Sequence, residues 1–372
     1  MKYTSLYNIF ILSLILFSCK NEIELDENIE SNKNEIEFSL SIDGRSIDYG
    51  YNGEDVAGDK EILSKYFISG KSCVLISQRS QNLSVNFNEG EPNCYKYVYN
   101  ENPAANWEND KFNFTSVNPM SWDKIISNGD FEGNYALCAL FYPGGNDNEN
   151  YVLANQSQEE SFFASDILGT WHKTESEGER LRFQLYHLMC YLYVELYVPV
   201  WDGKTGFFED ALDVAKALSL RTDFNIEWPK QSSEKAPLAS PSNQVSGNVS
   251  DITMHENNRD SNEMELSLSD FGIQDMEADK VRKYSLGILF PQQTVNNDFL
   301  KFTLKRGESF LEYVFKVTNT APGNSITFKP GEITRLKLYV PRTDNDILLI
   351  KAEIIKWEDA EASFTITKDP AK

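Results

Sequence analysis

The clearest pattern in the chain is an alternation of apolar and polar residues, which is the period-two pattern of a β-strand. It is most regular in residues 36–42, where every second residue is apolar and the residues between them are Glu or Ser. The apolar positions are Ile36, Phe38, Leu40 and Ile42. We therefore predict that this segment is the first strand and that one of its faces packs against a core.

The longest apolar and aromatic run is residues 181–198, and its alternation changes phase at His187. After the change, one face carries Leu188, Cys190, Leu192, Val194, Leu196 and Val198. A slip of one residue moves every side chain to the other face, so we interpret the run as one long strand with a bulge near 186–187. A membrane helix is not expected, because charged residues interrupt the run.

Short strand-like runs occupy much of the remaining chain, separated by clusters of Asn, Gly and Asp. They are residues 66–69, 73–77, 83–87, 95–99, 112–114, 135–142, 264–268, 284–290, 300–305, 310–317, 325–328, 334–340, 348–357 and 363–367. Many short strands at regular spacing predict an all-β fold of the sandwich type. Two segments lack this pattern: residues 210–220 fit a helix or an irregular strand, and residues 231–259, rich in Ser, Asn and Pro, are predicted to be an exposed loop.

The length of 372 residues is enough for about two domains of roughly 150 residues each. A turn at residues 174–179, with Glu and Gly, precedes the long apolar run. We place a domain boundary near Ser176, which gives an amino-terminal domain over 36–175 and a carboxy-terminal domain over 176–372.

The first 18 residues are predicted to be a lipoprotein signal peptide. An apolar segment too short to span a membrane ends at Leu16-Phe17-Ser18-Cys19, which has the pattern of a lipoprotein cleavage box. Lipid on Cys19 would anchor the protein stably to the outer membrane. The alternative is an ordinary secretory signal with an incidental Cys. The acidic segment 19–35 is predicted to be a flexible tether, and either a surface-export signal or a plain linker fits it.

Net charge and composition argue against several classes of function. The formal charge of −22 repels nucleic acid, so no nucleic-acid partner is expected. Four cysteines of the exported part, Cys73, Cys94, Cys138 and Cys190, allow three disulfide pairings, but buried free thiols are the favoured interpretation. No catalytic or phosphate-binding motif is present, and His187 is interpreted as a structural histidine. We therefore predict no catalytic, cofactor-binding or metal residues, no cofactor and no enzyme activity.

Several pieces of sequence, in this order, resemble the fimbrillin-like family (Mfa-like fimbrillins), lipoprotein pilus subunits of fimbriated Gram-negative anaerobes. They are the lipobox at Cys19, the first strand followed by Arg45, Asp166-Ile167-Leu168 before 183–198, Leu289-Phe290-Pro291-Gln292-Gln293, Phe328-Lys329-Pro330-Gly331-Glu332 before 336–338, and Ile354-Ile355-Lys356-Trp357. The resemblance covers nearly all of the exported chain.

The resemblance implies two transthyretin-like β-sandwich domains in tandem and a pilus that assembles by strand exchange. A protease would remove the first strand and a strand of another subunit would replace it. Arg45 is the candidate cleavage site, with Arg79 as the competing site. The expected location is the cell surface, with other pilus subunits, outer-membrane lipid and a host or bacterial surface ligand as partners. The alternative is a lipid-anchored glycan-binding protein, in which Trp107, Trp122, Trp171 or Trp201 would stack on sugars, although a role in the core explains these residues better.

Overall fold

The computed structural model describes most of the chain after residue 35. The described residues are 36, 38–42, 45–46, 65–100, 114–145, 150–174, 181–208, 210–228, 237–241, 248–260, 262–267, 278–296, 298–317, 325–342 and 348–356. The predicted signal peptide, Cys19, the acidic tether, Trp107 and the predicted strand at 363–367 lie outside them. Within them the chain is mostly β-strands with few helices, which confirms the all-β prediction. Neither described helix has the length or the apolar character of a membrane span.

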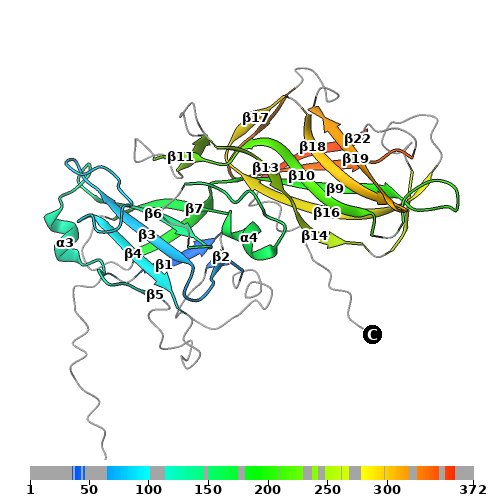
Figure 1. Cartoon of the computed structure of the whole chain (residues 1–372). Helices are drawn as coiled ribbons and strands as arrows, with labels where there is room; N and C mark the ends of the chain where they lie inside the picture. Colours follow the sequence, from blue (N-terminus) through cyan, green and yellow to red (C-terminus); the bar gives the residue numbers. More distant parts are fainter. Residues whose placement is uncertain are drawn as a thin grey trace, which may run out of the picture.

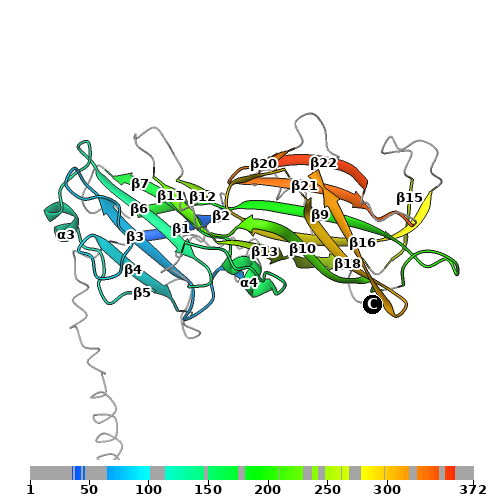
Figure 2. The same cartoon turned by 45° about the horizontal axis from the view of Figure 1, so that its top comes forward.

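The strands form two bodies that lie end to end (Figures 1 and 2). The amino-terminal body is one sheet in the order β2-β1-β8-β7-β6-β3-β4-β5. Its strands are β1 (Phe38–Ile42), β2 (Arg45–Ser46), β3 (Cys73–Arg79), β4 (Cys94–Tyr99), β5 (Phe114–Thr115), β6 (Tyr135–Tyr142), β7 (Leu168–Thr174) and β8 (Leu181–His187), with helices α3 (Trp122–Ser127) and α4 (Glu159–Ala164) beside them.

This sheet curls into two facing layers at the junction of β7 and β8. These two strands share only two register pairs, Leu168 with His187 and Gly169 with Tyr186, and then separate. Beyond that corner, strands β2, β1 and β8 lie over β4 and β5. The contact between Phe38 of β1 and Tyr97 of β4 shows this arrangement. The layers enclose a core of alternating side chains from both parts of the sheet.

The carboxy-terminal body consists of two facing sheets and two small two-stranded sheets. One sheet has β14 (His255–Arg259) and β15 (Met264–Leu266) beside β16 (Asp279–Phe290), followed by β9 (Cys190–Pro199), β21 (Glu332–Tyr339) and β22 (Leu348–Lys356). The other has the order β13 (Val249–Thr253), β10 (Leu212–Arg221), β18 (Asp298–Arg306) and β19 (Ser309–Lys316). The small pairs are β11 (Phe224–Glu227) with β12 (Leu238–Pro241) and β17 (Gln293–Val295) with β20 (Ile326–Phe328).

Strand β9 is the centre of the larger sheet, between β16 and β21. Its predicted inner face is confirmed: Leu192, Val194 and Leu196 are each fully buried in the core between the two sheets. On the opposite face Glu195 is also buried, and Arg335 and Lys337 pair with its carboxylate at 2.6 and 3.5 Å. Burial opposes the charge of Glu195, but the hydrogen bond and charges of its basic neighbours outweigh burial and lower its pKa.

The prediction of one bulged strand over residues 181–198 is wrong. The run contains two strands in different sheets, β8 and β9, joined by the buried residues Leu188 and Met189. The backbone of this link is hydrogen-bonded, with Leu188 N donating to Ile167 O and Gly331 N to Met189 O. The change of phase at His187 therefore marks the passage from one sheet to the next. This passage lies later than the boundary predicted near Ser176, because β7 and β8 are neighbours in one sheet.

Of the two structures that the sequence left open for residues 210–220, the irregular strand is confirmed. Residues 212–221 form strand β10 between β13 and β18, and a register shift between Ala217 and Leu220 makes the strand irregular. One further segment differs from its predicted structure. The predicted loop at 231–259 contains β12, β13 and β14. Strands β13 and β14 are mainly polar and lie at sheet edges, and β12 is only four residues long, so none of them shows an alternating apolar face.

The two bodies share packed side chains and paired backbone. Residues 150–156 leave the first sheet and bond to the second body, where Val152 N donates to Thr222 O and Gln156 N to Thr253 O. The buried Gln156 side chain completes the edge of β16 by bonding both the N–H and the C=O of Leu289, at 2.9 and 2.7 Å. The bodies are therefore joined by residues 150–156, which bond to the second body, as well as by the 188–189 link.

Leu192→Ala tests the packing of β9. Leu192 is fully buried beside Ile288 and Thr334, so we expect a loss of about 2–5 kcal/mol in the free energy of unfolding, because a large side chain leaves a cavity. Phe310→Ala is the matched control at a side chain that is 56% exposed, with an expected loss of less than about 1 kcal/mol. Urea unfolding of both variants measures the difference, and equal losses would show that the inner face of β9 is wrongly assigned.

Candidate functional site

The first strand fills a buried, largely aromatic site, and all four of its predicted core residues lie there. Ile36, Phe38, Leu40 and Ile42 are 3%, 8%, 1% and 5% exposed. They face the layer formed by β3, β4 and β6, in the same core as Leu181, Phe183 and Leu185 of β8. We call the space that these four side chains occupy the β1 seat.

Phe38 has the largest side chain in the β1 seat and meets three other rings. Its centroid lies 4.8 Å from Tyr97, 5.7 Å from Phe114 and 6.1 Å from Phe183, the first and last in edge-on geometry. These rings come from β4, β5 and β8, so one side chain connects both layers of the amino-terminal body. Contacts of this kind contribute beyond the area that they bury.

The core that holds β1 also contains an un-ionised phenol, the side chain of Tyr95. Burial raises the pKa of Tyr95 to about 12, so this ring stays neutral at physiological pH. Tyr95 belongs to the same core as the first strand. The interactions described for β1 are apolar packing and backbone hydrogen bonds.

The backbone of β1 is paired along its full length on one side only. It runs parallel to β8, with five register pairs from Phe38–Leu181 to Ile42–Leu185. On the other side β2 contributes only two pairs, Ser41–Ser46 and Ile42–Arg45, among the strands described. At the amino-terminal end, Ile36 N donates to Met120 O at 3.1 Å. Removal of β1 would therefore expose an unpaired edge on β8 together with four apolar positions.

The two candidate cleavage sites lie in different surroundings. Arg45 begins β2, which lies at the end of the described sheet and pairs with β1. Arg79 ends β3, which lies between β4 and β6, and its guanidinium carbon is 4.3 Å from the centre of the Phe131 ring. A protease binds its substrate as an exposed extended segment, so this placement favours Arg45 over Arg79.

The histidines of the described chain have structural surroundings. His187 Nδ1 lies 2.7 Å from Asp166 Oδ2 in the interior, and His255 Nδ1 lies 3.1 Å from the carbonyl oxygen of Ser157. His172 packs edge-on against Phe183 at 5.7 Å. In the part of the chain that is described, no group of three or more His, Cys, Asp or Glu side chains is placed to hold a metal ion.

The four cysteines are free thiols and all of them are buried, as the sequence favoured. They lie on separate strands: Cys73 on β3, Cys94 on β4, Cys138 on β6 and Cys190 on β9. Burial raises the pKa of Cys138 to about 12 and also raises the pKa of Cys190. Cys138 and Cys190 are therefore protonated packing groups.

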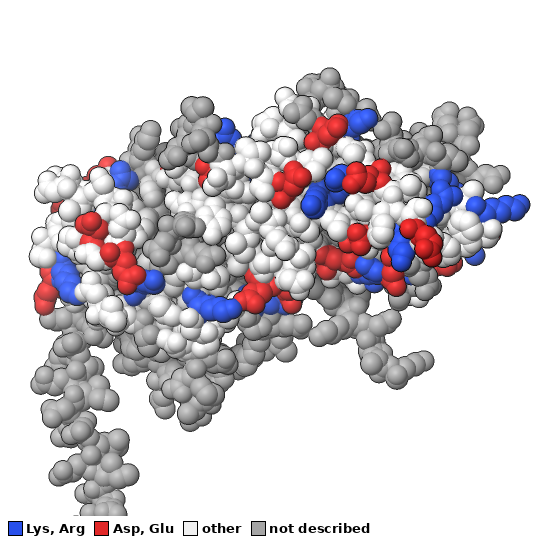
Figure 3. Space-filling view, in the orientation of Figure 1, with Lys and Arg blue, Asp and Glu red and all other residues white. Residues whose placement is uncertain are grey.

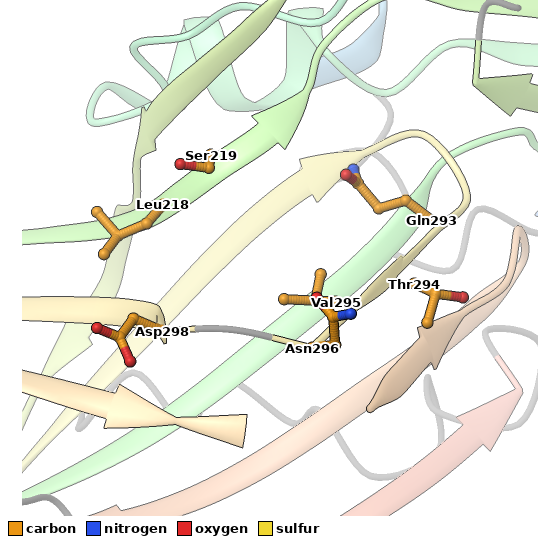
Figure 4. Close-up of a pocket in the computed structure, with 7 residues that line it drawn as sticks. All are labelled: Leu218, Ser219, Gln293, Thr294, Val295, Asn296 and Asp298. Atoms are coloured by element: carbon orange, nitrogen blue, oxygen red, sulfur yellow. The ribbon is translucent and has the colours of Figure 1, made fainter. Parts of the chain in front are cut away.

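A second feature, which the sequence did not indicate, is an open hollow of about 530 Å³ beside the irregular part of β10 (Figure 4). It is lined by Leu218, Ser219, Gln293, Thr294, Val295, Asn296 and Asp298. Ser219 adopts a φ of 54° at the register shift, which is unusual for a residue other than Gly. The Gln293 amide is already bonded to the backbone N–H and C=O of Arg221. The hollow offers hydroxyl, amide and carboxylate groups but no aromatic ring.

A third feature is an exposed aromatic pair on the loop after β9. The rings of Trp201 and Phe208 are stacked at 5.4 Å with an interplanar angle of 20°, and the two residues are 38% and 48% exposed. Arg342 fixes the loop by bonding to Asp279, Thr205 O and Val200 O. On the face drawn in Figure 3, acidic and basic side chains are interspersed over both bodies.

No protein-family model and no curated protein matches the chain. Several solved structures are similar to it. A candidate cell adhesion protein from Bacteroides uniformis has 10% sequence identity over 87% of this chain and 98% of its own, with a TM-score of 0.46. A fimbrial protein from Bacteroides vulgatus has 11% identity over 87% and 99% of the two chains, with a TM-score of 0.39.

The tip fimbrial protein Mfa3 from Porphyromonas gingivalis, with a C-terminal truncation, has 8% identity over 79% of this chain and 96% of its own, with a TM-score of 0.36. Identities and TM-scores of this size record a similarity and do not by themselves place the chain in a family. The structural neighbours are fimbrial and cell adhesion proteins, the same kind of protein as the family that the sequence resembles.

Proposed function

We propose that the chain is a fimbrillin-like cell-surface lipoprotein, a structural or accessory subunit of a pilus that assembles by protease-triggered strand exchange. Its two bodies correspond in this proposal to two transthyretin-like domains, and its partners are other subunits of the same kind. The observation that carries the proposal is the first strand itself. It buries four apolar side chains in a prepared seat, yet it is paired along its full length with a single neighbour.

The β1 seat suits exchange because an empty seat is unfavourable in water. Each large apolar side chain that leaves such a site forfeits about 1.5–3 kcal/mol of burial free energy. Four seats of this kind and the exposed edge of β8 would bind a replacement strand through apolar packing and backbone hydrogen bonds together.

The geometry of β1 defines the strand that fits. A replacement must run parallel to β8 to reproduce the five register pairs. It must carry apolar residues at alternate positions, and the position of Phe38 favours an aromatic ring because Tyr97, Phe114 and Phe183 surround it. A neighbouring subunit that supplies such a strand would be joined without any covalent bond.

Cleavage after Arg45 and lipidation of Cys19 have opposite consequences in this proposal. One cut after Arg45 separates Cys19 from the folded body. A subunit that is cut becomes free to enter the fibre, whereas an uncut subunit stays attached to the outer membrane. The same chain thus serves as a polymerising subunit or as an anchor, according to whether a protease reaches Arg45.

We expect an Arg-specific protease to convert the purified protein into a fragment that begins at Ser46 and forms higher oligomers. Arg45→Ala should stay monomeric after the same treatment, because its first strand remains attached. Amino-terminal sequencing and size-exclusion chromatography measure both results. Arg79→Ala is the control and should assemble like the unaltered protein. Monomer in every case would exclude strand exchange through this seat.

We expect Cys19 to be the mature amino terminus and to carry lipid. Cells that express the protein should incorporate a fatty-acid probe into it, and Cys19→Ala should lose both the label and its place in the membrane fraction. Ser18→Ala keeps a small residue before Cys19 and should label normally. A Cys19→Ala protein that still takes up the probe would contradict the lipoprotein assignment.

The exposed pair of Trp201 and Phe208 supports a second candidate function, a lipid-anchored surface protein that binds glycans. A rigid loop that presents an aromatic face suits stacking against a sugar ring, and Arg342 holds this loop in place. Of the other tryptophans considered from the sequence, Trp122 is buried and Trp171 is partly buried.

Trp201→Ala tests this second function. On affinity gels that contain surface oligosaccharides, we expect the unaltered protein to be retarded and the variant to bind at least fivefold more weakly. Phe310→Ala removes another exposed aromatic ring, on β19, and should leave retention unchanged. Equal migration of the protein and the Trp201 variant on every gel would remove the glycan-binding role.

A further inference from the structure

Strand β8 forms one wall of the β1 seat, and its connections to the rest of the fold are uneven. With β1 in place, β8 is paired over residues 181–185. Without β1, its ladder among the described residues consists of two pairs with β7, both at the His187 end. The wall that must receive a new strand would then be attached to its sheet at one end.

A buried cluster of three polar side chains lies at that end. Asp166 Oδ2 accepts a hydrogen bond from the Tyr66 hydroxyl at 2.6 Å and lies 2.7 Å from His187 Nδ1. Tyr66, Asp166 and His187 are 6%, 0% and 5% exposed. The cluster therefore lies in the interior, where a hydrogen bond to a carboxylate is strong and water does not compete for it.

The cluster connects three segments that are distant in sequence. Tyr66 belongs to the part of the chain that follows the candidate cut at Arg45, Asp166 precedes β7, and His187 ends β8. The backbone around each member is also held. Ser72 Oγ donates to Tyr66 O at 2.7 Å, and Leu188 N donates to Ile167 O at 3.0 Å. None of these contacts involves β1.

We propose that Tyr66, Asp166 and His187 form a clamp that keeps β8 in position as the wall of the β1 seat after the first strand has left. This inference rests on the proposed strand exchange. The three are positioning residues: the hydrogen bonds that join them do not involve β1, and they act on the seat through the end of β8. They fix the end of β8 and the chain that follows the cut to the same carboxylate, so that release of β1 leaves an open seat in a folded body.

The test uses the full chain cut after Arg45 and a fluorescent synthetic peptide of residues 36–42. Tyr66→Phe removes one hydroxyl and keeps the ring that packs on Phe163, so it preserves folding better than changes at Asp166. Tyr197→Phe is the matched control, because it removes the same kind of bond, from a buried Tyr to the carboxylate of Glu195, in the other body. Fluorescence anisotropy measures peptide binding, and hydrogen exchange measures protection of the β8 amides.

We expect the cut Tyr66→Phe chain to bind the peptide at least tenfold more weakly than the cut unaltered chain, and its β8 amides to exchange at least tenfold faster. Before the cut, β8 of the variant should be protected as in the unaltered protein, because β1 still pairs with it. A merely structural role would lower protection equally before and after the cut. His187→Gln should show the same pattern as Tyr66→Phe.

Two different failures are distinguishable. If the cut unaltered chain binds no peptide, the proposed strand exchange is wrong, and the clamp, which rests on it, is wrong as well. If the cut unaltered chain, Tyr66→Phe and Tyr197→Phe all bind equally well, strand exchange stands and the clamp is wrong.

Discussion

The burial of one alternating apolar face, from Ile36 to Ile42, is the interaction on which the amino-terminal body depends. Phe38 touches rings of β4, β5 and β8, so the first strand closes the core between two layers that otherwise meet at only two register pairs. The same strand is the first described strand of the chain, and only β8 pairs with it along its full length among the strands described. Exchange between subunits requires such an element: a strand that the core needs and that the chain can release.

The link between β8 and β9 determines how this first core relates to the second. Leu188 and Met189 are buried, and their backbone is bonded to both bodies. The clamp at Asp166 and His187 lies at the start of this link, so the wall of the β1 seat is fixed at the point where the two bodies join. Residues 150–156 make a second connection, which leaves the body that receives a strand firmly attached to its neighbour.

Regular alternation predicted the elements whose faces differ most in polarity. The first strand and the inner face of β9 were identified because one face of each is aliphatic or aromatic in sequence while the alternate positions carry polar groups. Strand β10 was left ambiguous because its alanines suit a helix and its bulge breaks the period. Strands β13 and β14 were missed because polar edge strands have little apolar surface to reveal them, and β12 was missed because it is only four residues long.

The candidate functional residues also divide into those that a local sequence pattern predicts and those that only the fold brings together. The residues of the β1 seat could be identified from local pattern, whereas the contacts of Asp166 could not. Tyr66 and His187 lie 100 and 21 residues away from it in sequence, and only the fold brings them together. The phase change at His187 was visible, but sequence periodicity cannot distinguish a bulge from a change of sheet, because both shift the side chains by one position.

The most direct measurement of the central claim is assembly of a chain whose first strand is held in place by a reversible bond. Ser41 and Gln184 are register partners on β1 and β8, so cysteines at these two positions fall within reach of a disulfide. After cleavage at Arg45, the oxidised double variant should remain monomeric, and a reducing agent should start the formation of oligomers. Oligomers that form equally well with the disulfide intact would contradict the account, because they would show that β1 need not leave.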